Sequence, residues 1–367
     1  MKKFFLYSFI TIFVVLILSA LILQIPFFQD KIFENLSKYR LLSALEWDLE
    51  EDALQVTVCG SGSPVATPGR AQSCLLVQTH NDMYIFDIGD GSVTNLINWG
   101  VPLERLKAVF ITHLHSDHFA DLGDLRLVSW IGRDRVEKVK LFGPEGIQQV
   151  AAGFEMAFKF DQEYRIAHHG VDLAPPNSVG FITKETREGE IFIEKDLTVS
   201  AFRVDHEPVD PAFGYRINYK DRSIVISGDT LLSDNLISYS KGVDVMFHEA
   251  LSKEMTSLIS ENSKDIYDEY GIQMAKLGAP VFIDIQDYHA SPIDAAIAAR
   301  DSGAGLLVYY HLVPSPSEPI KPIMEKIFFR GVDNYFTNWI SSNDGTKIIL
   351  PSGLSLIHIS EPTRLTS

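Results

Sequence analysis

The segment THLHSDH at residues 112–118 carries four possible metal ligands within six positions. The segment follows the apolar run AVFI, which is expected to be a β-strand, and it precedes DLGDLRLVSWIG, which is expected to be a helix. The segment should therefore form the turn between them. In an extended turn His113 and His115 can point the same way, whereas Asp117 and His118 enter the next helix and face a second point nearby. This spacing suits two metal ions about 3.5–4 Å apart that share a bridging hydroxide. A surface cluster of histidines is the alternative, and the spacing disfavours it.

The chain resembles the metallo-β-lactamase superfamily, whose other motifs occur in the expected order over roughly residues 53–350. The matching positions are Asp87 in FDIGDG, His206 in RVDHEP, Asp229 in ISGDT and His311 in VYYHLVP. Each follows an apolar strand, as expected if ligands gather at strand ends. His206 or His311 alone would more often be an ordinary core or surface histidine, but the ordered set favours a metal site.

The resemblance implies two bound ions, with zinc expected and other divalent metals as alternatives. The superfamily pattern assigns His113, His115 and His206 to one ion, Asp117, His118 and His311 to the other, and Asp229 as the bridge. Asp87 would be the structural residue that holds the metal-binding turn. Two cations would make the bridging water acidic enough to act as hydroxide near neutral pH.

Three features resemble the ribonuclease Z-like branch, which also contains enzymes that act on small phosphodiesters and aryl sulfates. VCGSGSPVATPGRAQSCLLV is similar to the glycine-rich opening of that branch, FHEA matches its His-Glu-Ala element, and YHASPIDAA resembles its His-Ser-Thr helix start. The branch implies that His289 protonates the leaving group, a task that suits a group titrating near neutrality. A helix-capping histidine without a catalytic part is the alternative.

Asp117, His289, His248 and Glu249 are therefore the candidate catalytic residues. For His248 and Glu249, a buried polar pair that orients loops or ligands is as reasonable as direct proton transfer. His168 and His169 are expected to be an exposed loop pair.

The expected function is a dinuclear zinc hydrolase in which a metal-bridging hydroxide attacks a small phosphodiester or aryl sulfate ester. The alternatives are a lactonase or thioesterase, a ribonuclease Z-type endonuclease, and a catalytically silent, membrane-tethered binding module. A β-lactamase is disfavoured because several of its subclasses place Cys where Asp229 stands. An oxygen-reducing di-iron relative would usually carry Glu at the position of His115. The oligomeric state stays open.

Nucleic acid is not an expected partner. The formal net charge of −16 gives a surface that repels polyanions. In ribonuclease Z-like enzymes a long, basic, Gly-rich arm that grips RNA commonly lies between the third-motif histidine and the fourth-motif aspartate. Between His206 and Asp229 the sequence instead predicts a strand, a turn at residues 219–222 and another strand.

The N-terminal run from Phe4 to Phe28 is uncharged and, at 1.5 Å per helical residue, exceeds the roughly 30 Å of a bilayer core. An uncleaved anchor is expected, with a cleaved signal peptide and a buried helix as alternatives. Lys2 and Lys3 favour a cytoplasmic N-terminus, which would place the rest in the periplasm, tethered to the inner membrane. Signal cleavage would instead give a secreted or periplasmic protein.

Strands alternate with helices after residue 53, which predicts an α/β fold, and the resemblance implies an αββα sandwich after one N-terminal transmembrane helix. The predicted parts are a membrane anchor or signal (1–28), a juxtamembrane spacer (29–52), the hydrolase domain (53–352) and a non-native tail (353–367). The tail SLIHISEPTRLTS resembles a translated sequencing adaptor and lacks helical or strand periodicity. A polar helical region is expected over about Lys253–Leu277, and a capped helix from Pro292 to about Asp301.

The two cysteines, Cys59 and Cys74, flank a Gly- and Pro-rich turn between two expected strands. A disulfide is conceivable in an oxidising compartment, but two buried free thiols are the favoured interpretation. Neither cysteine fits a zinc site, because the chain has no Cys-x-x-Cys pairing.

Overall fold

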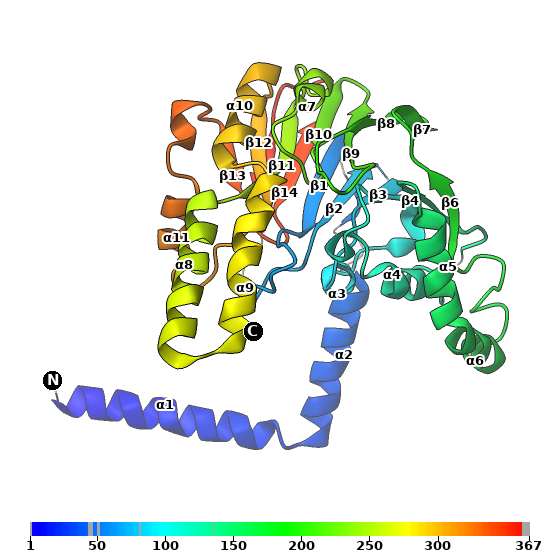
Figure 1. Cartoon of the computed structure of the whole chain (residues 1–367). Helices are drawn as coiled ribbons and strands as arrows, with labels where there is room; N and C mark the ends of the chain where they lie inside the picture. The colour runs from blue at the N-terminus through cyan, green and yellow to red at the C-terminus, as the bar shows by residue number, and fades with distance from the viewer. Residues whose placement is uncertain (1, 43–46, 50–51, 81, 134, 362–367) are drawn as a thin grey trace. The chain divides into compact units, whose positions relative to one another are not determined.

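The computed structural model describes residues 2–42, 47–49, 52–80, 82–133 and 135–361 (Figure 1). The chain forms two compact units. The first contains Met1–Asp48 and Trp99–Val101, and the second contains Leu49–Asn98 and Pro102–Ser367. The predicted spacer and tail fall partly at residues 43–46, 50–51 and 362–367, which lie outside the described residues.

Two helices make up most of the first unit, namely α1 (Lys2–Ile22) and α2 (Pro26–Leu42). The segment Phe4–Ile22 is long and apolar enough to cross a membrane, and a signal sequence would pass the same test. The apolar helix is shorter than the run to Phe28 suggested, because a turn at residues 23–25 separates it from α2. Pro26 then opens α2, at a position where its missing N–H costs the helix nothing.

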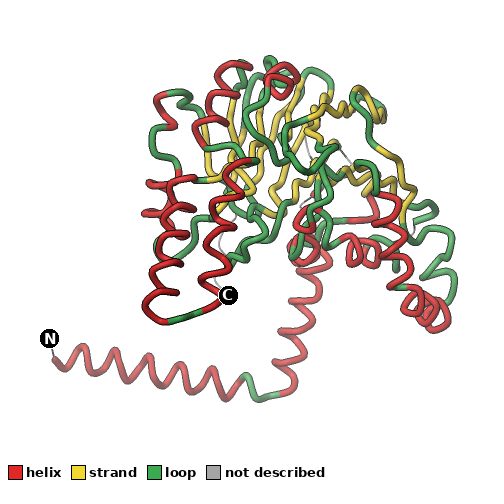
Figure 2. The backbone as a smooth tube through the Cα atoms, viewed as in Figure 1, coloured by secondary structure: helices red, strands yellow, loops and turns green. Residues whose placement is uncertain are grey.

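Two β-sheets form the second unit (Figure 2). The first sheet has, in spatial order, β15 (His358–Ser360), β14 (Lys347–Pro351), β1 (Ala53–Gly60), β2 (Cys74–Thr79), β3 (Asp82–Phe86), β4 (Leu106–Phe110), β5 (Val139–Gly143) and β6 (Phe181–Glu185). The second has β13 (Trp339–Ser341), β12 (Leu306–Val313), β11 (Val245–Leu251), β10 (Arg222–Ile226), β9 (Phe213–Tyr219), β8 (Leu197–Arg203) and β7 (Gly189–Glu194).

Helices contact the outer faces of both sheets, which gives the expected αββα sandwich. On the side of the first sheet lie α3 (Ser92–Asn98), α4 (Leu122–Val128), α5 (Ile147–Ala157) and α6 (Lys159–His169). On the side of the second lie α7 (Asp234–Tyr239), α8 (Lys253–Tyr270), α9 (Gln273–Asp284), α10 (Pro292–Ser302) and α11 (Lys321–Phe328). Short 3₁₀ turns are η2 (Leu103–Arg105), η3 (Ser116–His118), η4 (Ile285–Asp287) and η5 (Val332–Asn334).

The main core fills the space between the two sheets and is rich in aromatic side chains, including Phe86, Phe110 and Tyr215. Strands β1, β2, β3, β11 and β12 are buried along their whole length, as expected for strands covered on both faces. A second core lies under α10, whose buried alanines allow the helix to approach β11 and β12 closely.

The helix α10 begins as the sequence predicted. The side chain of Ser291 accepts a hydrogen bond from Asp294 N, and the Asp294 carboxylate accepts one from Ser291 N. Pro292 occupies the first turn. This capping fixes the point at which the chain leaves His289.

The polar helical region predicted over about Lys253–Leu277 is confirmed, and it consists of two helices. The structure breaks it at Gly271, which adopts φ 69° and ends α8, and the chain continues as α9 to Asp284. The segment thus forms a helical hairpin. Helices α6 and α7 and strands β6 and β7 were not predicted from the sequence.

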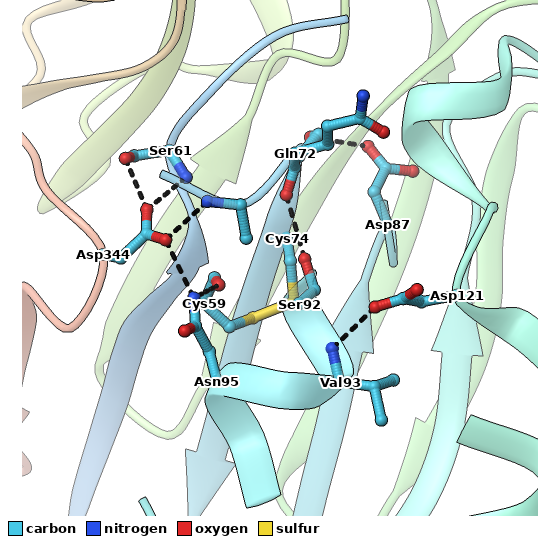
Figure 3. The surroundings of a disulfide bond; sticks show 12 residues. Cys59, Ser61, Gln72, Cys74, Asp87, Ser92, Val93, Asn95, Asp121 and Asp344 are labelled. Atoms are coloured by element: carbon cyan, nitrogen blue, oxygen red, sulfur yellow. Dashed lines mark hydrogen bonds between the residues drawn. A yellow bond between two sulfur atoms is a disulfide. The ribbon is translucent and has the colours of Figure 1, made fainter. Parts of the chain in front are cut away.

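The preferred interpretation of Cys59 and Cys74 as free thiols is wrong. The structure joins them in a disulfide between the end of β1 and the start of β2, where their Cα atoms lie 4.9 Å apart (Figure 3). The bond closes the loop of residues 60–73. The carboxylate of Asp344 orders that loop by accepting hydrogen bonds from Ser61 N and Ala71 N.

The C-terminal tail also differs in part from expectation. Residues 358–360 form the edge strand β15, which pairs antiparallel with β14, although the segment lacks strand periodicity. Main-chain hydrogen bonds along an exposed edge do not require alternating side chains, which explains why the sequence did not reveal the strand.

Candidate metal centre

The candidate site is built from segments that follow strands of both sheets. The segment 112–118 follows β4, His206 follows β8, Asp229 follows β10, and His311 lies near the end of β12. The parallel strands β10, β11 and β12 end at one edge of their sheet, so residues after them converge.

All seven predicted ligands are brought together. His113, His115, His206 and Asp229 each offer a ligand atom within 4.8 Å of the others, and Asp117, His118 and His311 form a second group by the same measure. The Oδ2 atom of Asp229 lies 3.8 Å from His113 Nε2 in the first group. It also lies 3.3 Å from His118 Nε2 and 3.5 Å from His311 Nε2 in the second. This one carboxylate therefore adjoins both groups.

Asp87 fixes the turn that carries four of these side chains. Its carboxylate accepts hydrogen bonds from Thr112 N at 2.8 Å and from Thr112 Oγ1 at 2.9 Å. The same carboxylate lies 2.8 Å from Nδ1 of His118, which turns Nε2 of that ring toward Asp229. Asp87 adopts φ 56°, a left-handed conformation that is unfavourable for a residue with a side chain. The observed contacts fit the structural role expected for it.

His206 is oriented from outside the site in a similar way. Its Nδ1 lies 2.9 Å from the carbonyl oxygen of Tyr288, so Nδ1 carries the proton and donates. Nε2 is then unprotonated and lies 3.3 Å from Nδ1 of His115. The sequence did not point to Tyr288 as a partner, because a carbonyl group carries no residue-specific signal.

Local backbone geometry also places Asp229 and His311. Gly228 adopts φ 64°, and a Cβ atom there would lie 2.7 Å from the carbonyl oxygen of Phe213, so a side chain would displace the loop before Asp229. His311 adopts φ 47° within β12, which is strained for a non-glycine residue. Both positions support a site whose geometry is imposed by the surrounding fold.

The imidazoles of the site fall into two groups by the direction in which burial and neighbouring charges shift their pKa. Burial lowers the pKa of His113, His115 and His206, which keeps these rings neutral and able to donate a lone pair. For His118 and His311, burial also lowers the pKa, but the adjacent carboxylates, with Asp229 first, outweigh it and raise the pKa.

The two carboxylates stay ionised inside the protein. Burial would raise the pKa of Asp117 and Asp229, but the neighbouring histidines hold both pKa values below the ordinary range. Buried negative charge of this kind needs cationic partners. Several buried atoms, His118 Nε2, Asp229 Oδ1 and His311 Nδ1, make no hydrogen bond. Of these atoms, His118 Nε2 lies 3.4 Å from an oxygen of Asp117 and 3.3 Å from one of Asp229, and an unpartnered nitrogen beside two carboxylates fits the coordination of cations.

Glu249 connects the candidate acid to the ligand loop. Its Oε1 lies 3.0 Å from His289 Nδ1 and accepts hydrogen bonds from Ala290 N and Thr230 N. Burial lowers the pKa of His289, but the charge and hydrogen bond of Glu249, with the charge of Asp229, raise it to about 9. His289 is therefore protonated near neutral pH and lies 3.9 Å from Asp229 Oδ2.

The other histidines lie apart from this arrangement. His248 is fully buried, and its Nδ1 lies 2.6 Å from the carbonyl oxygen of Glu249; the described interactions of its ring include no contact with the seven candidate ligands. His168 and His169 are exposed, as expected, but they end α6 rather than lying in a loop. The described contacts thus place Glu249, rather than His248, beside His289, and the catalytic roles of both residues stay predictions.

Fold and site together define a metal-dependent hydrolase with the metallo-β-lactamase fold. Residues 97–312 match the family described as the beta-lactamase superfamily domain. Ribonuclease Z of Mycobacterium bovis is 34% identical over 264 residues, which cover 71% of this chain and 87% of that protein. The chain belongs to the metallo-β-lactamase superfamily and to its ribonuclease Z-like branch.

Solved structures show the same fold. The metallo-β-lactamase fold protein YhfI of Bacillus subtilis superimposes with a TM-score of 0.57 at 17% identity, over 81% of this chain and 100% of that chain. The short form of human tRNase Z gives a TM-score of 0.51 at 21% identity, over 81% of this chain and 99% of that chain.

Proposed function

We propose that this chain is a dinuclear zinc hydrolase that cleaves small phosphodiesters or aryl sulfate esters. The observation that carries the proposal is the pair of adjoining ligand groups that share Asp229, with the protonated His289 beside them. The seven candidate ligands offer only imidazole and carboxylate groups, a donor set that zinc accepts. Manganese and iron accept similar ligands, so metal analysis is part of the test.

Bound at this site, two divalent cations would supply hydroxide near neutral pH and positive charge opposite the developing negative charge. The residues of the chain prepare the remaining steps. His289 donates the proton of its Nε2 to the departing oxygen, while its Nδ1–H stays hydrogen-bonded to Glu249, whose charge favours the protonated ring before transfer. Asp87 and the carbonyl of Tyr288 orient the rings of His118 and His206.

The connection from His206 to Asp229 supports a small substrate. All of its residues are described, and after a loop of six residues it consists of β9, a two-residue turn and β10. An RNA-gripping arm has no room in this stretch. The net charge of −16 also opposes binding of a polyanion. The preference for phosphodiesters and aryl sulfates rests on the resemblance to the ribonuclease Z-like branch.

A second candidate function is ribonuclease Z-type cleavage of transfer RNA precursors. It is favoured by the identity of 34% to a protein named ribonuclease Z, which this chain matches over 87% of its length. Both candidates use the same proposed metal ligands and the same acid, so only substrates distinguish them.

The purified full-length chain is expected to contain about two zinc ions and to hydrolyse bis(p-nitrophenyl) phosphate or p-nitrophenyl sulfate. A chelator should remove this activity, and zinc should restore it. Parallel reactions with a lactone and with a transfer RNA precursor bearing a 3′ trailer complete the assay. Faster cleavage at the trailer junction than of the small diesters would support the second candidate instead. Fewer than one ion per chain, with no activity after reconstitution, would support a silent binding module.

We further propose that α1 is retained as an anchor in the inner membrane and that the catalytic domain lies in the periplasm. Lys2 and Lys3 support this orientation, and the Cys59–Cys74 disulfide supports an oxidising compartment. A C-terminal fusion to alkaline phosphatase, which is active only after export, is expected to be active and to sediment with membranes. An inactive fusion would reverse the orientation, and activity in the soluble periplasmic fraction would indicate cleavage of a signal peptide.

A further inference from the structure

The outer face of α9 is an exposed apolar stripe. Met274, Leu277 and Val281 follow one another at helical spacing, and their exposed fractions are 81%, 73% and 52%. Lys276 and the last residue, Asp284, are the only charged residues of this helix. Soluble monomers seldom expose continuous apolar surface of this kind unless it binds something.

The connecting turn extends the stripe toward the tip of the hairpin. Tyr270 and Ile272 flank Gly271 and are 67% and 47% exposed. Figures 1 and 2 show α8 and α9 running side by side as a hairpin. An aromatic residue next to aliphatic ones at a protruding tip is typical of segments that enter the boundary between lipid headgroups and acyl chains.

The hairpin does not use this stripe to pack against itself. Its inner face is held by a hydrogen bond from Ser260 Oγ to the carbonyl oxygen of Ala279 at 2.7 Å. At the base, Gln286 Nε2 donates to Thr256 Oγ1 at 2.9 Å. Ala279 is the one buried residue of α9, so the helix packs through a narrow side and leaves the apolar stripe free.

The chain itself indicates a bilayer as the occupant. The segment Phe4–Ile22 can span a membrane, and 30 residues separate Ile22 from Ala53 at the start of β1. Seventeen of these residues form α2, which is about 25 Å long. A domain tethered at such short range meets the bilayer at high effective concentration, so a modest apolar patch is sufficient for docking.

The charges beside the stripe restrict the kind of lipid. Asp265, Asp268 and Glu269 are exposed at the end of α8, close in sequence to the apolar tip, and they outnumber the exposed cations there, Lys264 and Lys276. Anionic headgroups would be repelled by these carboxylates, whereas zwitterionic headgroups would not. The charge pattern therefore fits a phosphatidylethanolamine or phosphatidylcholine surface.

We propose that the α9 stripe, Met274, Leu277 and Val281 together with Tyr270 and Ile272, docks the catalytic domain on the zwitterionic bilayer in which α1 is anchored. The proposal depends on α1 being retained as an anchor. It does not depend on the substrate of the enzyme. The docked helix would be joined to the site by a short segment, because α9 leads through η4 directly to Tyr288 and His289.

The test uses the full-length chain, one copy per nanodisc, with a tryptophan introduced on the stripe by Leu277→Trp or Val281→Trp. Brominated phosphatidylcholine quenches tryptophans that reach its acyl chains. The added emission is expected to fall by at least about half, because a docked helix lies roughly 5–10 Å into the headgroup and acyl boundary. The matched control is Ile323→Trp on α11, where the native residue is 61% exposed, and its added emission is expected to be unchanged.

Equal quenching of the stripe and control variants, or none in either, would overturn the proposal. So would quenching that rises when brominated phosphatidylglycerol replaces brominated phosphatidylcholine, because the acidic flank predicts the opposite. A second copy of the chain as the occupant is tested by cross-linking at two copies per disc. Cross-links through α9 without quenching in single-copy discs would assign the stripe to self-association. Turnover is not measured, so none of these results bears on the proposed hydrolysis.

Discussion

Replacing Asp229 by alanine is expected to lower kcat/KM by about 10³-fold or more and to reduce bound metal from about two ions per chain to one or none. Asp229 Oδ2 is the atom that adjoins both ligand groups, at 3.3 Å from His118 Nε2 and 3.8 Å from His113 Nε2. Its loss removes a buried negative charge from among five imidazoles. Metal analysis and turnover of a small diester measure the two effects on the same sample.

Two further variants control this result. Asp229→Asn keeps the shape of the side chain and removes its charge, so it is expected to lose activity to a similar extent without a cavity. Asp244→Asn changes a partly buried aspartate that accepts a hydrogen bond from Ser223 N and pairs with Arg222 near the starts of β10 and β11. That position is at the opposite ends of these strands, and metal content should stay normal. Undiminished turnover in Asp229→Ala would disprove the assigned role.

Much of the candidate site could be predicted from the sequence because its residues follow strands. The 112–118 segment contains four side chains at fixed spacing, Asp229 follows an apolar strand, and His311 is a polar residue near the end of another. Sheets bring the ends of their strands to one edge, so these residues had to converge. The structure divides the three-histidine set and the Asp117, His118 and His311 set between two groups, as the sequence predicted. Their role as metal ligands stays a prediction.

The choice between His248 and Glu249 could not be made from the sequence. Neighbouring residues of a regular strand face opposite sides, but the register between β11 and β12 shifts between His248 and Ala250. Such an irregularity leaves no trace in the pattern of apolar residues. Glu249 also meets His289 across 40 positions of chain, most of them in the α8–α9 hairpin. Only the folded chain shows that this carboxylate supports the candidate acid.

The disulfide and the hairpin were also missed for local reasons. Cys59 and Cys74 bond because β1 and β2 pair side by side and bring their Cα atoms to 4.9 Å, a distance that sequence spacing does not contain. The helical pattern of Lys253–Leu277 continued through Gly271, which a helix tolerates at a cost of only about 1 kcal/mol. Here the glycine takes a left-handed conformation and ends the helix.

Replacing His289 by alanine is expected to lower kcat by about 10²–10⁴-fold on a diester with a poor alkoxide leaving group. On bis(p-nitrophenyl) phosphate the loss should be under about tenfold, because the nitrophenolate hardly needs a proton to depart. The contrast follows from the position of the protonated ring beside Asp229 and from Glu249, which raises its pKa to about 9. Steady-state kinetics over a series of leaving groups measure it.

Two further variants, Glu249→Gln and His168→Ala, test whether the different losses on poor and activated leaving groups are caused by proton transfer from His289. The amide introduced by Glu249→Gln would keep the shape of the carboxylate and could still accept a hydrogen bond from His289, but it lacks the charge that holds the ring protonated. Glu249→Gln should therefore repeat the dependence on the leaving group with a smaller loss. His168→Ala removes an exposed ring on α6 and should leave both rates unchanged. Equal losses of kcat on activated and poor leaving groups in His289→Ala would mean that the ring positions the substrate or the ligands. The loss of a proton donor cannot slow the departure of a leaving group that needs no proton.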